Sequence, residues 1–116
     1  MTRILVHSAT GPENPTRAAL ALLVARTAAE EGHEVQVFLA GDAVQLVREA
    51  TAAAASGIGT GSGAEHLAAL KQAAAPVFLS GMSSKARGID ESAGYELAPP
   101  QKLVELATWA ETALTY

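Results

Sequence analysis

The residues of this 116-residue chain with the chemistry for a binding site follow the ends of short apolar runs that read as strands. In an open α/β sheet the carboxyl ends of the strands share one rim, where ligands usually bind. An imidazole, a carboxylate, a hydroxyl and nearby cations at that rim predict a small pocket for an anionic or polar ligand. The candidate ligand-binding residues are His7, Thr10, Gly11, Arg17, Asp42, Ser80, Lys85 and Arg87.

Ordinary structural roles fit the same residues taken singly. Asp42 can cap a helix, Ser8 can occupy a turn, and His7 can be a partly exposed residue at a strand end. Arg87 can equally form a salt bridge that fixes the turn after the third long strand. The sequence leaves both interpretations open.

Nucleophilic catalysis by Ser80 needs a neighbouring base and an oxyanion site. The G-x-S-x-G pattern is absent around Ser80, and no Ser-x-x-Lys pair occurs. His7 can serve as the base only if the fold brings it close. No catalytic residue is therefore assigned.

Two further kinds of site are not supported. The histidines at 7, 33 and 66 are widely spaced with no i, i+4 pair, so no metal site is predicted. The glycine-rich stretch 57–63 does not follow a good strand and lacks Gly-Lys-Ser/Thr, so it is not a nucleotide loop. We expect a flexible loop over residues 51–63, with the glycine-rich stretch as a solvated linker between helices, and no cofactor.

Composition excludes other classes of function. The chain has no cysteine, which excludes disulfides, thiolate metal sites and thiol chemistry. The net charge is −4 and no basic stripe alternates with aromatic residues, so no nucleic-acid partner is expected. No stretch approaches the roughly 20 apolar residues that span a membrane. We therefore expect a soluble cytoplasmic protein without a membrane partner.

Strand and helix patterns alternate along the chain. Apolar runs at 3–7, 34–39 and 76–79 predict buried strands, and residues 113–116 predict an edge strand. A helix is expected from Pro15 to Gly32, with Leu20, Leu23, Val24 and Ala28 on its apolar face. A short helix with Val44, Leu46 and Val47 is expected after Asp42, a longer one over 64–75, and a short helix or turn at 83–87. Pro99-Pro100 introduces a final helix with Leu103, Leu106, Ala107 and Ala110 as its apolar residues. This alternation predicts one domain over residues 1–116, an α/β/α sandwich with a mainly parallel sheet of about five strands.

Several short motifs recur together in one known family. They are Thr10-Gly11-Pro12, Pro15-Thr16-Arg17, Glu31-Gly32-His33-Glu34-Val35, Phe38-Leu39-Ala40-Gly41-Asp42, Lys85-Ala86-Arg87-Gly88-Ile89 and Pro99-Pro100-Gln101-Lys102-Leu103-Val104. In this order and spacing the chain resembles the DsrE/DsrF-like sulfur-relay family over nearly its whole length. The resemblance implies a flavodoxin-like architecture and a homo-oligomer, a trimer or hexamer.

The same resemblance implies where the chain departs from its family. Relay members carry sulfur as a persulfide on a cysteine eight residues before the glycine of the Arg-Gly pair, and that position is Ser80 here. A serine hydroxyl cannot form a persulfide. We therefore expect a non-catalytic oligomeric subunit that binds a small anionic ligand or acts as a scaffold. The alternative is an enzyme that uses the Ser80, His7 and Arg87 rim on an anionic substrate.

Overall fold

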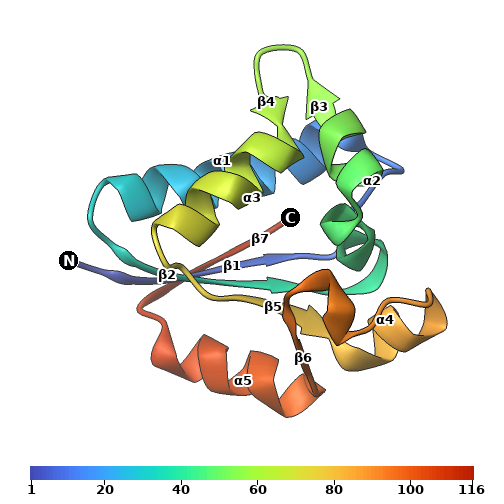
Figure 1. Ribbon diagram of the computed structural model, residues 1–116. Helices are drawn as coiled ribbons and strands as arrows, with labels where there is room; N and C mark the ends of the chain where they lie inside the picture. Colours follow the sequence, from blue (N-terminus) through green and yellow to red (C-terminus); the bar gives the residue numbers. More distant parts are fainter.

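A computed structural model, which describes residues 1–116, shows a five-stranded sheet with helices on both faces (Figure 1). Its strand order is β6-β5-β2-β1-β7, and every neighbouring pair is parallel. The strands are β1 (Arg3–Ser8), β2 (Glu34–Leu39), β5 (Val77–Ser80), β6 (Glu96–Ala98) and β7 (Thr112–Thr115). The predicted fold class is confirmed. The edge strand β6 is an element that the sequence patterns did not predict.

The first βαβ unit follows directly from local sequence signals. Helix α1 (Pro15–Glu30) begins after Asn14, whose side chain accepts a hydrogen bond from the backbone N–H of Arg17. Pro15 occupies the first helical position, where its missing N–H costs nothing. Gly32 then takes the left-handed conformation, with φ at 91°, and turns the chain into β2.

The larger core lies on the face of the sheet covered by α1 and α3 (Gly63–Gln72) (Figure 1). The predicted apolar face of α1 was wrong at most of its positions: Leu20 is 37 % exposed and only Ala28 of the four packs against the larger core, whereas the buried positions of α1 are almost all alanines. The helix buries this stripe because small side chains let it approach the sheet closely. The buried residues of α1 are Ala18, Ala19, Ala21, Leu22 and Ala25.

The opposite face of the sheet is covered by α5 (Pro100–Trp109) over a smaller core. That core contains five buried residues, namely Leu5, Phe38, Phe78, Ala98 and Leu106. The apolar stripe predicted for this helix is borne out at Leu103, Leu106 and Ala110, which pack against this core or belong to it, but not at Ala107, which is exposed.

The connection from β2 to α3 agrees with the sequence prediction only in part, since a short helix does follow β2 but the residues after it are not a loop. It forms a 3₁₀ helix, η1 (Gly41–Val47), then α2 (Glu49–Ala54), and then a hairpin of β3 (Ser56–Gly57) and β4 (Gly61–Ser62). The flexible loop expected over 51–63 was wrong: residues 51–54 lie in α2, and the glycine-rich part forms an ordered hairpin that contacts α1 and α3 (Figure 1).

Buried polar contacts explain why this hairpin is ordered. The Thr60 hydroxyl accepts a hydrogen bond from the Gly57 N–H at 2.8 Å, and Nε2 of the buried His66 lies 2.7 Å from the Thr60 carbonyl oxygen. Gly57 packs so closely on α1 that a Cβ there would stand 2.3 Å from the hydroxyl of Thr16. At Gly57, glycine is therefore required by close packing.

The remaining elements complete the edge near β6. Helix α4 (Gly81–Ala86) follows β5 directly, and a single 3₁₀ turn, η2 (Glu91–Ala93), precedes β6. No helix in the protein has both the length and the apolar character needed to cross a bilayer.

Candidate functional site

The predicted rim exists because β1, β2 and β5 are neighbours and run in the same direction. Ser8 pairs with Leu39, and Leu39 pairs with Leu79, so the three strands end at nearly the same level. The segments that follow them, residues 9–14, 40–47 and 80–87, consequently meet above one edge of the sheet.

Asp42 and Arg87 form an ion pair at this rim. The Arg87 guanidinium donates to Oδ1 of Asp42 at 3.0 Å and to the carbonyl oxygen of Ser83 at 3.0 Å. Asp42 also accepts from the side-chain amide of Gln45, and it does not cap η1. Of the two roles open to Arg87, the structure shows the salt bridge that fixes the turn.

Ser80 acts as the cap of α4. Its Oγ accepts a hydrogen bond from the backbone N–H of Ser83 at 3.3 Å. The Ser83 hydroxyl in turn accepts from the N–H of Gly41 at 2.9 Å. These two bonds tie the ends of β5 and β2 together, so both hydroxyls hold the rim in shape.

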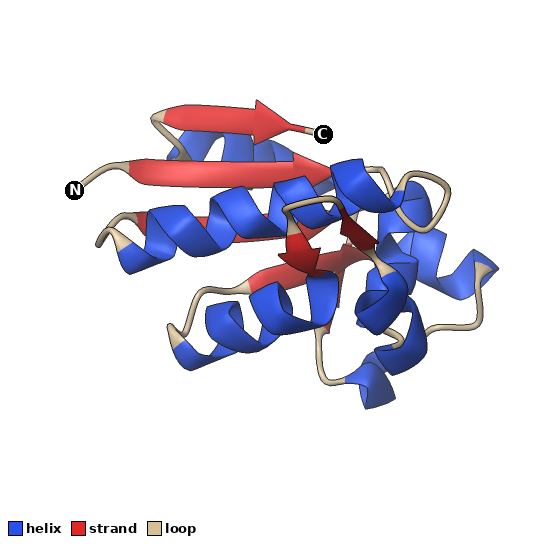
Figure 2. Cartoon of the chain, turned by 90° about the horizontal axis from the view of Figure 1, so that it is seen from above, coloured by secondary structure: helices blue, strands red, loops and turns tan.

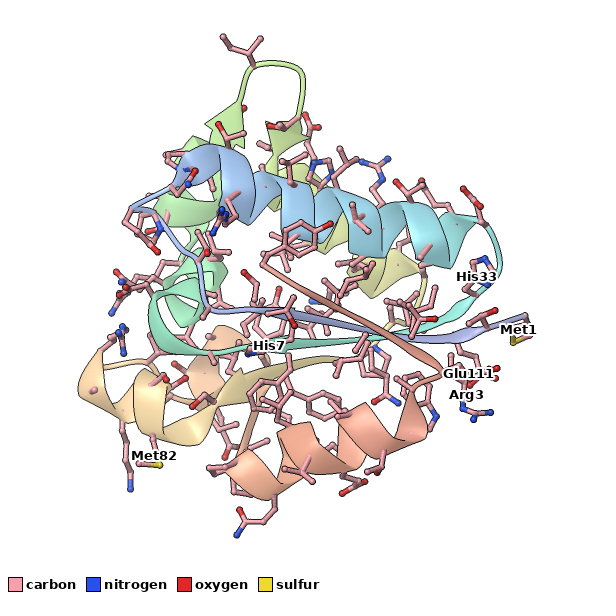
Figure 3. All side chains as sticks on the ribbon, turned by 180° about the vertical axis from the view of Figure 1, so that it is seen from behind. Met1, Arg3, His7, His33, Met82 and Glu111 are labelled. Carbon is pink, nitrogen blue, oxygen red and sulfur yellow. The ribbon has the colours of Figure 1, made fainter.

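His7 does not reach this hydrogen-bonded group. It lies on the α5 side of the sheet, half-buried, with its ring centroid 6.3 Å from that of Phe38 (Figure 3). Burial lowers the pKa of His7 below its ordinary value of 6.5, because desolvation disfavours the imidazolium. Strand β2 separates His7 from Ser80 on β5, and no hydrogen bond joins them. The geometry therefore does not assemble the serine–histidine pair that the enzyme alternative requires.

Thr10 and Gly11 shape the loop after β1. The Thr10 N–H donates to the Ser8 hydroxyl, and Thr10 itself is buried. Gly11 packs against the backbone of Asp42: a Cβ there would stand 2.1 Å from the Asp42 carbonyl oxygen. The position requires glycine because two loops cross in contact, which explains the Thr-Gly signature without a ligand.

Arg17 and Lys85, the other two predicted cations, lie on different sides of the molecule. Arg17 is on α1 and lines a depression with Thr115 and Tyr116, beside the end of β7. Lys85 is on α4 and borders a recess of about 400 Å³ next to the end of β5. The predicted cluster of three cations therefore does not form.

The recess beside Lys85 is the feature of the rim that the sequence did not reveal. Its walls come from α4 and from the turn between β6 and α5, and they are largely apolar. The lining residues are Gly81, Met82, Lys85, Leu97, Ala98, Pro99 and Pro100. Ser80 lies at its margin, because Ala98 is the partner of Ser80 in the β5–β6 ladder. Met82 is 72 % exposed and projects from α4 (Figure 3).

A single cation beside an apolar recess favours a small molecule with an anionic group and an apolar body. Lys85 belongs to none of the salt bridges, so its ammonium group is free to meet an anion. The proline and methionine walls suit the apolar body of a small molecule. Groups of three metal-ligating His, Asp or Glu side chains do not occur in the structure.

Comparison with known proteins places this geometry in context. The model of the DsrE/DsrF-like family matches residues 2–116. Among solved structures, the YchN protein of E. coli superimposes with a TM-score of 0.79 at 22 % identity, over 100 % of both chains. A conserved protein of unknown function, BT1422 from Bacteroides thetaiotaomicron, gives a TM-score of 0.72 at 11 % identity, over 99 % of this chain and 95 % of that one. None of the curated proteins matches the sequence significantly.

Proposed function

This chain belongs to the DsrE/DsrF-like family, and from that membership we propose that it is a non-catalytic subunit that assembles with copies of itself, as a trimer or hexamer, and binds a small anionic ligand. The ligand site is the recess bordered by Lys85, at the end of β5. The function is related to sulfur relay by descent of the scaffold and does not include sulfur transfer.

The observation that carries this proposal is the role of Ser80. The family resemblance implies that relay members carry their cysteine at the position of Ser80, and this chain has no cysteine anywhere. The Ser80 hydroxyl accepts a hydrogen bond from Ser83 as a helix cap, a structural task that needs no reactivity. An alcohol has a far higher pKa than a thiol, and oxygen cannot take the place of sulfur in a persulfide.

Lys85 is the proposed anion-binding cation because Arg87 is already paired within the chain and Arg17 lies elsewhere. Arg87 is held by Asp42 and by the Ser83 carbonyl oxygen, so its donors are already directed within the chain. Arg17 lies beside β7, away from the end of β5. Lys85 is the cation that borders the recess and has no ionic partner. Charge-assisted binding of an anion by Lys85 therefore costs no existing interaction.

The test is native mass spectrometry of the protein purified gently from its own cells. We expect a homo-oligomer that carries a reproducible added mass per subunit. The added mass should be lost in Lys85→Ala and kept in Lys71→Ala, a matched exposed lysine on α3 without a salt bridge. A monomer contradicts the proposed assembly, and the absence of added mass, or its persistence in Lys85→Ala, contradicts the proposed site.

A further inference from the structure

We propose that the protein has a second small-molecule site, at the end of the sheet opposite the rim, where a neutral carboxamide pairs with the backbone of Val35. This site is separate from the recess at Lys85 and does not depend on self-association. Two neighbouring strands that start at different levels create it. The ladder between β2 and β5 begins at Val37 and Val77, although β2 itself begins at Glu34. Figure 2 shows the late start of β5, which begins farther along the sheet than β1, the strand that follows the N label.

The hydrogen bonds of β2 show where the backbone of Val35 points. In a parallel sheet, alternate residues of a strand direct their N–H and C=O groups to opposite neighbouring strands. The Glu34 N–H donates to the Thr2 carbonyl oxygen, on the side of β1, whereas the Val37 N–H donates to the Pro76 carbonyl oxygen at 2.9 Å, on the side of β5. Val35 lies two residues before Val37, so its N–H and C=O groups also point to the side of β5.

Both groups of Val35 lack a partner there, for reasons that lie in the sequence. One step further along the ladder, the C=O of Val35 would accept from the N–H of residue 76, and its N–H would donate to the C=O of residue 74. Pro76 has no N–H to donate. Ala74 has a φ of 58°, in the left-handed region, so the chain turns there instead of continuing as a strand. No hydrogen bond joins Val35 to this turn.

A cavity of about 360 Å³ opens where the ladder is interrupted. Val35 and Pro76 both line it, and Ala73, Ala29 and Trp109 contribute to its apolar wall. Val35 is only 4 % exposed, so a molecule reaches its free backbone groups through this cavity. A buried backbone donor or acceptor without a partner is destabilising, and a water or a ligand that supplies the missing bond removes that cost.

One donor beside one acceptor, without charge, determines the chemistry of the ligand. A primary carboxamide carries a C=O and an N–H side by side, so it can bond both groups of Val35 in place of a strand residue. A carboxylate only accepts, and it would direct an unpaired oxygen at the Val35 carbonyl oxygen. The lining includes Glu34 and no lysine or arginine, which further disfavours an anion. The alanines and the indole of Trp109 suit an apolar or aromatic body.

The test compares benzamide, benzoate and acetophenone as probes of the ¹⁵N-labelled protein. All three have the same aromatic body, but only benzamide has both a donor and an acceptor. We expect benzamide to shift the amide resonance of Val35 and to change the fluorescence of Trp109, the only tryptophan of the chain. Its affinity should be at least about tenfold higher than that of the other two probes.

Variants test the pairing from the side of the protein. Pro76→Ala supplies the N–H that the Val35 carbonyl oxygen lacks, so benzamide should bind at least about tenfold more weakly. Pro12→Ala, the matched loss of an exposed proline in the loop after β1, should leave the affinity unchanged. If Pro76→Ala fails to fold, Ala73→Leu decides, because Ala73 is exposed and a larger side chain there narrows the cavity without entering the core.

Selective binding of benzamide that Pro76→Ala or Ala73→Leu weakens supports the site. Equal affinities for the three probes would mean that the cavity binds aromatic rings without using the backbone of Val35, which overturns the inference. A Val35 amide resonance that no probe shifts would mean that the gap in the ladder holds only water, and it overturns the inference as well. Binding that neither variant changes would place the ligand elsewhere, with the same consequence.

Discussion

The two faces of the central sheet are built in different ways. The face under α1 and α3 holds a core of 17 buried residues, nearly all of them Ala, Leu and Val. The face under α5 holds five, and its central strands include a half-buried histidine. The first face supplies most of the burial that stabilises the fold. The second face is covered more thinly, so single side chains there are expected to have smaller effects on stability.

The largest difference in lost stability is expected between two variants that each truncate one buried leucine. Leu22 on α1 is 0 % exposed and lies in the larger core, so Leu22→Ala should cost about 3–5 kcal/mol. Leu106 on α5 is 2 % exposed, but its cluster borders solvent and can relax, so Leu106→Ala should cost about 2 kcal/mol. Urea unfolding measures both. Equal costs would show that the thinner face is packed as tightly as the other.

Two glycines at the rim extend the comparison to the loops. Gly11→Ala should destabilise by about 1–3 kcal/mol, because the new Cβ meets the Asp42 carbonyl oxygen at 2.1 Å. Gly81→Ala is the matched control on the α5 side, where the closest atom to the Cβ is the Ala98 carbonyl oxygen at 3.5 Å. That change should be neutral or slightly stabilising, since alanine restricts the unfolded chain. Thermal unfolding of both variants measures this difference in packing. Similar losses of stability in the two variants would contradict the prediction.

A smaller effect is expected where a lysine covers the thinner face. Nζ of Lys102 lies 4.7 Å from the ring centroid of Phe78 and 3.3 Å from Glu105. Lys102→Gln should cost about 0.5–1 kcal/mol by loss of the cation–π contact. Glu105→Gln removes only the exposed ion pair and should cost about 0–0.5 kcal/mol. If both variants lose the same stability in chemical unfolding, the aromatic contact contributes nothing.

The smallest effect is the pH dependence caused by His7. Its pKa is lowered in the folded state by burial, so below pH 6.5 the unfolded chain binds a proton that the folded chain resists. Stability from this source is therefore complete above pH 6.5 and falls as the pH drops toward the folded pKa. The difference in unfolding free energy between the wild type and His7→Gln, measured from pH 8 to pH 5, should shift against the wild type. The other histidines cancel in this difference, and a flat difference would mean that His7 ionises freely in the fold.

Local signals in the sequence predicted most of the fold. Asn14-Pro15 and Gly32 mark the limits of α1 through backbone chemistry that is independent of the rest of the molecule. The buried face of α1 was mispredicted because the helix is apolar on several sides, and only the sheet decides that Ala18 and Ala21 face inward. The hairpin at 57–63 was missed because its order depends on His66 and Thr16, which lie outside it in sequence.

The candidate site was predicted only in part, because it too depends on contacts between residues that are far apart in the sequence. Strand ends identify a rim, and Asp42, Ser80 and Arg87 do lie there. The sequence cannot show that Arg87 is neutralised by a residue 45 positions away. The recess likewise combines Met82 with Leu97 and Pro99, and β6, which carries Leu97, is too short to be recognised by its pattern.

The pairing of β1 with β7 has a consequence for how the protein is made. These strands join residues 4–7 to residues 112–115, so one edge of β1 has no partner until more than a hundred further residues have left the ribosome. Contacts of such long sequence separation slow folding, because the intervening chain must be ordered before they form. During synthesis the nascent chain therefore exposes β1 as a bare edge, which a chaperone can shield until β7 arrives.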